Sequence, residues 1–427
     1  MNIIRKKILF LYIITTSILG IFINFYFTYR IFKNKENKES AQQKSFKNVK
    51  LRPLGTLIWI HASSVGESLS ALPLIELIIK NQTFDNILFT TSTITSKAII
   101  ENRISDKVLH QYLPLDTIFL ARRFLNHWKP NSIAFIESEI WPNFFQQIKK
   151  IDVPFYIANA RMSENSFKKW KKYNTGAKEL LSAADIIFAQ DSTAESKFKS
   201  LGVSNICNIG NIKFDSSPLP VDKIKYNSLK AKFDKKIIFV AGSTHEIENF
   251  EIVKIHQSLS KQISNLMTII VPRQLLEIHA LEKFMVKNNI SYSKKSNSED
   301  TNNNSNLLIV DTMGELGLYY KIANIAFIGG SLINKGGQNP IEALQFDCPV
   351  LHGKHTSNFH EIYKNLDKLG GAIRVNDEKE LESTLIELIK DTKTIKNMNK
   401  ANANLIKLNQ GASVIIERIL SLNTQGD

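Results

Sequence analysis

The sequence predicts an α/β protein with two doubly wound domains, each built on a parallel sheet, behind an N-terminal membrane-anchor helix. Three features support this prediction. An uncharged apolar run lies near the N-terminus, short apolar runs then alternate with longer helical patterns, and this alternation restarts after residue 216. The length of 427 residues also exceeds what one ordinary core accommodates.

The expected anchor is the run Ile8–Tyr29, which contains no charged residue. Its length is about that of a helix crossing the hydrocarbon layer, roughly 20 residues. A signal peptide is the alternative, but the run is long for one and no small-x-small cleavage site follows it. Basic residues continue from Arg30 to Lys50, which places the bulk of the chain in the cytoplasm, at the inner membrane.

Beyond the anchor, apolar runs mark the expected strands. In the first half these are Leu57–Ile60, Ile87–Thr90, Ser132–Ile136, Phe155–Ala158 and Ile186–Ala189. In the second half they are Ile237–Val240, Met267–Val271, Leu307–Val310 and Ile325–Ile328. Helical patterns separate the runs, so parallel sheets covered on both faces are predicted.

Pro-rich, polar and basic stretches set the expected boundaries. A segment with two prolines and no periodicity begins at Asp215 and marks the link between the domains. The expected parts are an anchor at 1–32, a basic linker at 33–54, a first domain at 55–216, a second at 217–410, and a C-terminal helix at 411–427 that can pack back on the first domain. An Asn/Ser-rich stretch, Lys294–Asn306, is expected to be a surface loop.

The composition limits the classes of partner that the protein is expected to bind. Lys+Arg 55 against Asp+Glu 40 gives a net charge of +15, which favours anionic partners such as acidic lipids and phosphorylated substrates. The sequence has no Arg-rich or aromatic-interleaved stripe and no zinc-finger spacing, so nucleic acid is not expected. Cys207 and Cys348 are isolated from one another, which argues against a disulfide framework or a zinc site and fits a reducing compartment.

The first candidate site residue is Glu67, in the stretch His61–Ser68 that follows the first strand and opens a helix. A carboxylate at this end of a strand can take a proton from a substrate hydroxyl. The spacing from Ser64 to Glu67 also matches a capping box, so a purely structural role is the alternative.

A second group lies after the strand Ser132–Ile136. Glu137 and Glu139 precede a helix start at Pro142, and they serve either as site carboxylates or as ordinary helix-start charges. Lys213, beside the link between the domains, can reach a phosphate.

Two further motifs lie in the second half. Ser243 and Glu246 match a capping box after its first strand, without the glycine spacing of a dinucleotide site. The run Gly329–Ala343 has four glycines before a helix with Asn339 at the cap and Pro340 in the first turn. The cap explains the last two residues but not the glycines, which indicate a loop pressed against a ligand, with Glu342 able to accept hydrogen bonds from ribose hydroxyls.

Taken together, these motifs resemble the 3-deoxy-D-manno-octulosonic acid (Kdo) transferase family. The resemblance runs from about Leu57 to Gly411 and rests on motifs in the family's order: HASSVGES, ESEIWPN, IANARMSENS, NIKFD, STHE, VPR, DTMGELGLYY, GGSLINKGGQNPIEA and HTSNF. It implies a GT-B fold of two Rossmann-like domains facing a cleft. It also implies CMP-Kdo as the donor substrate, a lipid A precursor as the acceptor, and neither cofactor nor metal.

The resemblance also implies roles for particular residues. Glu67 corresponds to the general base, and Glu137 and Lys213 correspond to residues that stabilise the transition state. The stretches that contact CMP correspond to Pro272, Arg273, Met313, Gly314, Glu315, Asn339, Pro340, Ile341 and Glu342.

On this basis the expected reaction is inverting. Glu67 deprotonates a glucosamine hydroxyl, whose oxygen attacks the anomeric carbon of Kdo as the bond to CMP breaks.

The chain departs from the family's pattern at two places. Gln274 and Leu275 follow VPR where His-Pro is frequent, and an Arg-x-Gly-Glu-Arg type run is missing before the first strand. The alternatives are a membrane-associated GT-B transferase with another nucleotide sugar, or a membrane-tethered binding protein without activity.

Overall fold

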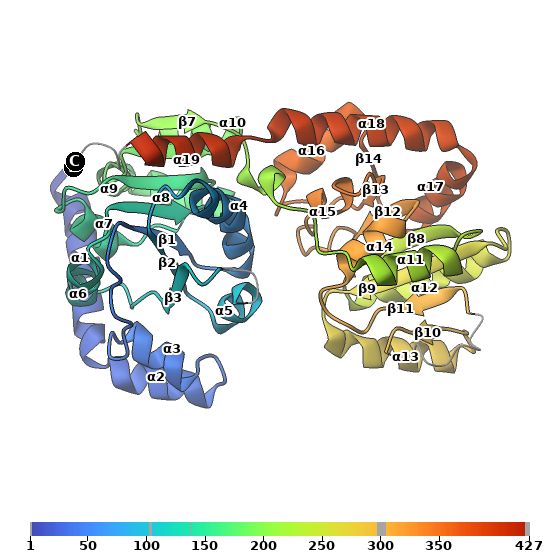
Figure 1. Ribbon diagram of the computed structural model, residues 1–427, viewed down its shortest axis with the longest axis horizontal. Helices are drawn as coiled ribbons and strands as arrows, with labels where there is room; N and C mark the ends of the chain where they lie inside the picture. The colour runs from blue at the N-terminus through green and yellow to red at the C-terminus, as the bar shows by residue number, and fades with distance from the viewer. Residues whose placement is uncertain (1, 102–104, 138, 297–304, 423–427) are drawn as a thin grey trace. The chain divides into compact units, whose positions relative to one another are not determined.

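The fold is described by a computed structural model that covers residues 2–101, 105–137, 139–296 and 305–422 (Figure 1). It confirms the α/β class, since the described residues form two seven-stranded parallel sheets. The chain divides into two compact units. The first unit comprises Met1–Ser216 and Asn409–Asp427, and the second comprises Ser217–Leu408.

The first unit is built on a doubly wound sheet. Its strands are β1 (Leu57–Ala62), β2 (Asn86–Thr91), β3 (Val108–Tyr112), β4 (Ser132–Ile136), β5 (Phe155–Ala160), β6 (Ile186–Ala189) and β7 (Ile206–Asn208). Their order is β3-β2-β1-β4-β5-β6-β7, and the direction of winding reverses between β1 and β4. Such a switch point places the carboxyl ends of β1 and β4 side by side at the edge where ligands bind.

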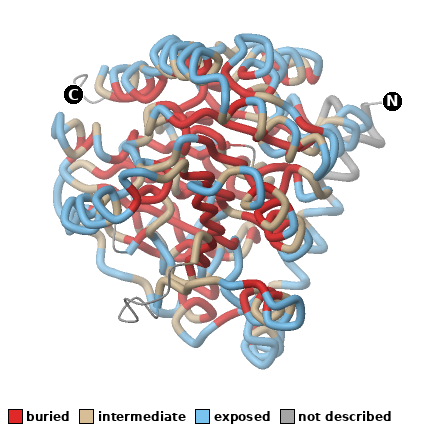
Figure 2. Tube along the Cα trace, turned by 90° about the vertical axis from the view of Figure 1, so that its right-hand side faces the viewer, coloured by how far each residue is buried: buried red, intermediate tan, exposed pale blue. Residues whose placement is uncertain are grey.

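Helices cover both faces of this sheet. They are α1 (Asn2–Ile21), α2 (Ile23–Phe32), α3 (Lys38–Lys44), α4 (Val65–Asn81), α5 (Ile94–Ile100), α6 (Ile118–Trp128), α7 (Pro142–Ile148), α8 (Glu164–Lys172), α9 (Asn174–Leu181), α10 (Ser192–Ser200), the 3₁₀ helix η1 (Ile212–Asp215) and α19 (Ala412–Leu422). Every residue of β1, β4 and β5 is buried, as expected for central strands covered on both sides. Figure 2 shows buried residues in the interior and mostly exposed residues along the outer helices.

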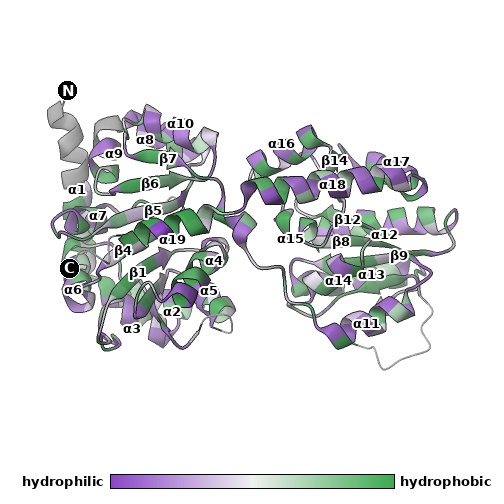
Figure 3. Cartoon of the chain, turned by 45° about the horizontal axis from the view of Figure 1, so that its top comes forward, coloured by the Kyte–Doolittle hydropathy of each residue, from purple (hydrophilic) through white to green (hydrophobic). Residues whose placement is uncertain are grey.

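The second unit has the same architecture, a parallel sheet with helices. Its strands are β8 (Ile237–Thr244), β9 (Leu266–Pro272), β10 (Ser293–Lys294), β11 (Leu307–Ile309), β12 (Ile325–Ile328), β13 (Val350–His352) and β14 (Ala372–Arg374), in the order β10-β11-β9-β8-β12-β13-β14. Its helices are α11 (Lys223–Lys232), α12 (Glu246–Ser260), η2 (Leu275–Glu277), α13 (Ile278–Lys287), α14 (Leu316–Ile322), α15 (Ile341–Leu344), α16 (His360–Leu369), α17 (Glu378–Lys390) and α18 (Thr392–Asn409). The strands are predominantly hydrophobic, whereas α18 alternates hydrophobic and hydrophilic residues (Figure 3).

The end of the chain returns to the first unit. Helix α19 packs against α4, and its Ile416 and Leu420 join the apolar core behind β1. Asp215 fixes the start of this helix, because its carboxylate accepts hydrogen bonds from the backbone N–H of Gly411 at 2.6 Å and of Ser413 at 2.7 Å. The first unit is therefore completed by residues from both ends of the sequence.

The N-terminal apolar segment differs from the expected single helix. It forms α1 and α2, and the stretches Leu11–Ile21 and Ile23–Phe32 meet at an angle of 71°. Within the described residues, no single helix has the length and hydropathy of a membrane span, while this bent pair meets both criteria taken together. The two helices have different partners: Tyr12 of α1 donates to Asp116 at 2.8 Å, whereas Phe27 of α2 is buried.

Residues 33–54 also differ from the polar linker expected there. The segment contains α3, capped by Asn37, and α3 packs against the edge strand β3. Lys44 is buried, forms an ion pair with Glu36 at 2.6 Å and donates to the carbonyl of Ser92 at 2.7 Å. A buried ion pair fixes this segment in a way that a basic composition does not reveal.

Five strands were not anticipated from the sequence: β3, β7, β10, β13 and β14. Each is short and lies toward the edge of its sheet, where an apolar run is not required. In the expected loop Lys294–Asn306, residue Lys294 belongs to β10, and residues 297–304 lie outside the described residues.

Candidate functional site

Glu67 lies in the first turn of α4, directly beyond the carboxyl end of β1. Ser64 is the N-cap, and its hydroxyl accepts a hydrogen bond from the N–H of Glu67 at 3.3 Å. The Glu67 carboxylate accepts hydrogen bonds from the N–H of Ser63 at 2.7 Å and from the Ser64 hydroxyl at 3.1 Å. Glu67 therefore contributes to the cap and also presents a carboxylate at the edge of the sheet.

The surroundings of Glu67 make its carboxyl unusually basic. Burial raises its pKa to about 7, and the negative charges of Glu137 and Glu139 add to the increase, against the opposing effect of the Ser63 and Ser64 hydrogen bonds. A carboxyl group with this pKa can exchange a proton near neutral pH.

His61 supports this turn from the core. The ring lies between the Thr90 hydroxyl, at 2.9 Å from Nδ1, and the Ser63 hydroxyl, at 3.0 Å from Nε2. Burial lowers the pKa of His61 to about 3, so the ring is neutral. His61 thus holds Ser63, whose N–H in turn holds Glu67.

Glu137 lies between two cations just after β4. One carboxylate oxygen is 2.7 Å from Lys213 Nζ, on η1, and the other is 2.7 Å from Arg161 Nε, just after β5. Burial alone would raise the pKa of Glu137, but the charges of Lys213 and Arg161 outweigh it, so the pKa lies below its usual value. Glu137 is therefore an anion paired with both cations.

The backbone at Glu137 is also unusual. Its φ of +63° lies in the left-handed region that non-glycine residues rarely adopt. The strand β4 ends at Ile136, as predicted, and Glu137 lies in the turn that follows it. The structure thus brings Glu67, Glu137 and Lys213 to the carboxyl edge of one sheet.

Arg161 has no role assigned in the sequence analysis, although it lies within the motif IANARMSENS. One feature of the sequence could have indicated Arg161: it is a basic residue immediately after an apolar strand. Such a position lies at the ligand-binding edge of a parallel sheet. Sequence spacing does not show that Arg161 and Lys213 share one carboxylate.

In the second unit, the expected nucleotide residues follow three strands. Pro272 is the last residue of β9, and the N–H of Arg273 donates to the Thr244 carbonyl at 2.7 Å, which leaves the exposed Arg273 side chain at the edge. Met313 and Gly314 lie between β11 and α14, with Met313 68% exposed and Gly314 at a φ of +83°.

Glu315 and Glu342 are held in place by neighbouring groups. Glu315 forms an ion pair with Lys225 at 2.6 Å and accepts a hydrogen bond from the Thr312 hydroxyl. Asn339 accepts a hydrogen bond from the N–H of Ile341 at 3.2 Å and donates to Glu342 at 3.3 Å, while Pro340 directly precedes α15. The N-cap of α15 is thus Pro340 and not Asn339 as predicted, although the Asn339 side chain still accepts a hydrogen bond from the first N–H of the helix.

The capping residue of α12 differs from our prediction. The N-cap is His245 rather than Ser243, and the N–H of His245 donates to Glu248 at 3.1 Å, so the capping carboxylate is Glu248 and not Glu246. Glu248 is buried and also accepts hydrogen bonds from the N–H groups of Gly330, Ser331 and Leu332 at 2.7, 3.1 and 3.1 Å. The capping carboxylate thereby shapes the glycine-rich loop.

Within the described residues, no group of three or more His, Cys, Asp or Glu side chains is arranged to hold a metal ion. The chemistry that can be assigned to the first unit is proton transfer at Glu67 together with the charges of Glu137, Lys213 and Arg161. The second unit supplies loops and helix starts suited to a phosphorylated ligand.

The chain is similar to known proteins along most of its length. A family model described as 3-Deoxy-D-manno-octulosonic-acid transferase (kdotransferase) matches residues 31–216. The chain is 35% identical to a 3-deoxy-D-manno-octulosonic acid transferase of Haemophilus influenzae over 86% of each chain. It is 31% identical to a probable mitochondrial 3-deoxy-D-manno-octulosonic acid transferase of Arabidopsis thaliana, over 83% of this chain and 82% of that one.

Among solved structures, the fold is similar to that of the UDP-GlcNAc 2-epimerase from Neisseria meningitidis bound to UDP-GlcNAc. The TM-score is 0.59 at 12% identity, over 86% of this chain and 99% of the other. At this identity the similarity establishes the fold alone.

Proposed function

The chain belongs to the 3-deoxy-D-manno-octulosonic acid (Kdo) transferase family, a family of glycosyltransferases, and from this premise we propose that it transfers Kdo from CMP-Kdo to the lipid A precursor lipid IVA, inverting the configuration at the anomeric carbon. The observation that carries the proposal is the carboxyl of Glu67, whose pKa is raised to about 7 at the carboxyl edge of the first sheet. A general base that titrates near neutrality suits the removal of a hydroxyl proton.

In the proposed reaction, Glu67 takes the proton of a glucosamine hydroxyl on the acceptor. The acceptor oxygen forms the new bond to the anomeric carbon while the bond from that carbon to the CMP phosphate oxygen breaks. CMP leaves with the bonding electron pair. The backbone N–H of Ser63 and the hydroxyl of Ser64 keep the carboxylate of Glu67 oriented for proton transfer.

Charge develops as the bond to CMP breaks: positive on the sugar and negative on the phosphate. We assign transition-state stabilisation to Glu137 and Lys213, which form an ion pair at 2.7 Å. The pairing supports a preorganised arrangement, in which these charges need no rearrangement during the reaction. Arg161 is proposed to share this role because it binds the other oxygen of Glu137.

The direct test is to incubate the purified protein with CMP-Kdo and lipid IVA and to read the products by mass spectrometry. We expect a mass increase by one or more Kdo units, because the number added depends on acceptor geometry. Parallel reactions with UDP-sugars should give no product. Transfer from a UDP-sugar but not from CMP-Kdo would assign the chain a different donor.

We propose that CMP binds the second unit at Pro272, Arg273, Met313, Gly314, Glu315, Asn339, Pro340, Ile341 and Glu342. Arg273→Ala and Glu342→Ala should each lower CMP affinity about tenfold or more, since each removes a charged hydrogen-bonding group. Calorimetry measures the loss of CMP affinity. The midpoint of thermal unfolding of each variant should stay near that of the parent. Lys232→Ala, on α11, is a matched control. Unchanged CMP affinity in both variants would place the nucleotide elsewhere.

We propose that the bent helix pair α1–α2 attaches the protein to the inner membrane. Exposed apolar side chains on it include Phe25 and Phe32, both 78% exposed, and basic side chains follow from Arg30. Such a surface favours an anionic bilayer. A Phe25→Ser/Phe32→Ser variant should lose most of its membrane binding without unfolding, because neither side chain is part of the core.

Flotation with anionic vesicles, after a high-salt wash, measures that change. Ile224→Ser, at an exposed apolar position of the second unit, is the control and should float like the parent. Deletion of Met1–Arg30 should abolish flotation. A deleted protein that still floats after the wash would show that another surface provides the main attachment.

A further inference from the structure

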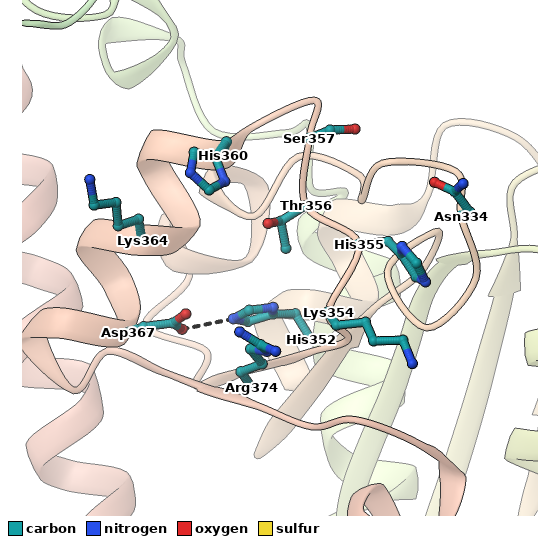
Figure 4. Close-up of a pocket in the computed structure, with 10 residues that line it drawn as sticks. All are labelled: Asn334, His352, Lys354, His355, Thr356, Ser357, His360, Lys364, Asp367 and Arg374. Carbon is teal, nitrogen blue, oxygen red and sulfur yellow. Dashed lines mark hydrogen bonds and ion pairs between the residues drawn. The ribbon is translucent and has the colours of Figure 1, made fainter. Parts of the chain in front are cut away.

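A cavity of about 400 Å³ opens within the second unit, at the carboxyl ends of β13 and β14 (Figure 4). It is lined by the ends of these strands, by residues of the HTSNF motif and by one side of α16. No role has been assigned above to this motif or to this cavity.

The lining is strongly cationic. Lys354, Lys364 and Arg374 contribute three fixed positive charges, and Thr356 and Ser357 contribute hydroxyl groups. In the part of the chain that the structure describes, Lys354 and Arg374 form no ion pair, and the carboxylate nearest Lys364 is that of Glu361, at 3.9 Å. Two of the three cations, Lys354 and Arg374, therefore have no ion-pair partner among the described residues, whereas Lys364 is paired with Glu361.

The one carboxylate in the lining, Asp367, is already bound. Its oxygen lies 2.8 Å from Nε2 of His352, whose Nδ1 lies 2.7 Å from the carbonyl oxygen of Gly353. Asp367 is thus bound to the buried His352, and neither Lys354 nor Arg374 forms an ion pair with it.

The cavity is joined to the expected nucleotide region by backbone hydrogen bonds. The N–H of His355 donates to the carbonyl of Ser331 at 2.9 Å, and the N–H of Asn358 donates to that of Gly336 at 2.8 Å. Gly336 has a φ of +84°, and a Cβ there would lie 2.7 Å from the side chains of Ser357 and Asn358. Only glycine allows the two loops to approach this closely.

The position along the sheet indicates what the cavity binds. The expected nucleotide residues follow β11, β9 and β12, whereas the cavity follows β13 and β14, the next strands at the same edge. A group held here is therefore adjacent to the nucleotide and distinct from it. Three cations and two hydroxyls suit an oxyanion, either a carboxylate or a phosphate.

We propose that this cavity is an oxyanion subsite that binds an anionic group of a substrate other than the nucleotide phosphate. The inference rests on the proposed function, which supplies two sources of such a group: the carboxylate of the donor sugar and a phosphate of the lipid acceptor. The experiment below distinguishes these two sources.

The test uses Lys354→Gln and Arg374→Gln in the full chain, with Lys368→Gln as the control, because Lys368 lies on α16 but does not line the cavity. Calorimetry measures the affinity for CMP and for CMP-Kdo, and initial rates give the KM for lipid IVA. Thermal unfolding confirms that each variant is folded.

If the subsite holds the sugar carboxylate, the variants bind CMP-Kdo about tenfold more weakly and bind CMP like the parent. If it holds an acceptor phosphate, both nucleotide affinities are unchanged and the KM for lipid IVA rises about tenfold. Unchanged values in all three measurements, or an equal loss of CMP and CMP-Kdo affinity, would overturn the proposal. A parent protein that transfers Kdo in that case retains the proposed function, so the two failures are distinguishable.

Discussion

Glu67→Gln is expected to lower turnover by about 10²-fold or more, while CMP affinity stays close to that of the parent. Glutamine keeps the size of the side chain and can still accept a hydrogen bond from the N–H of Ser63, but it cannot take up a proton. Initial rates at saturating CMP-Kdo and lipid IVA measure the loss. If Glu67 serves only as a cap, Gln replaces it nearly as well and the rate hardly changes.

Ser64→Ala is the matched control, because Ser64 is the N-cap and its removal weakens the start of α4 without removing the carboxylate. It should cost about 1 kcal/mol of stability and far less activity than Glu67→Gln. Near-normal turnover in Glu67→Gln would exclude Glu67 as the base and direct the search to Glu137 or Glu139.

The pH dependence offers a second readout of the same residue. The pKa of Glu67 is raised to about 7 in the folded protein, and the base acts only when deprotonated. The rate should therefore rise with pH up to about 7 and level off above it. The residual rate of Glu67→Gln should not show this rise with pH.

Stability should change with pH in the opposite sense. Between the ordinary pKa of 4.5 and about 7, the folded state keeps the Glu67 proton that the unfolded state has lost. This carboxyl therefore stabilises the fold most at low pH, and its contribution falls as pH rises toward 7. Glu67→Gln should remove that fall, so the variant should be at least as stable as the parent at pH 8, as urea unfolding would show.

Glu137→Gln is expected to destabilise the first unit by about 3 kcal/mol, because it leaves Lys213 and Arg161 close together without their shared counter-charge. The Lys213 side chain is 12% exposed, so water compensates little for the lost partner. Urea unfolding measures the loss, and transfer activity should also fall.

The double variant Glu137→Gln/Lys213→Gln is the control for this effect. Removing the second charge should restore part of the stability, since the cost arises from the unpaired cation, but it should not restore activity. Arg161→Gln should be milder because Arg161 is 41% exposed. An unfolding midpoint in Glu137→Gln equal to that of the parent would show that the pairing contributes nothing to the fold.

The sequence alone determined the class of fold and most central strands. Short apolar runs such as Ser132–Ile136 and Ile325–Ile328 coincide with β4 and β12, because a strand buried on both faces consists mostly of apolar residues. The order of long motifs likewise determined the family, since joint matches over most of the chain do not depend on spatial arrangement.

Edge strands and the N-terminal segment were decided by tertiary structure. β13, next to the sheet edge, and β14, at the edge, have three residues each and are too short to stand out as apolar runs. Ile8–Tyr29 satisfies the length and hydropathy of one straight span, yet the helix breaks between Ile21 and Ile23; on one side of the break Tyr12 bonds to Asp116, and on the other Phe27 is buried. Contacts with residues distant in sequence override local propensity in such segments.

The same division applies to the candidate site. Sequence motifs indicated Glu67, Glu137 and Lys213 separately, because each follows a strand or a helix start. Only the tertiary structure placed Lys213 and Arg161 on the two oxygens of Glu137 and buried Glu67 enough to raise its pKa to about 7. The physical reason is that charge and solvation depend on distances between side chains, which sequence separation does not specify.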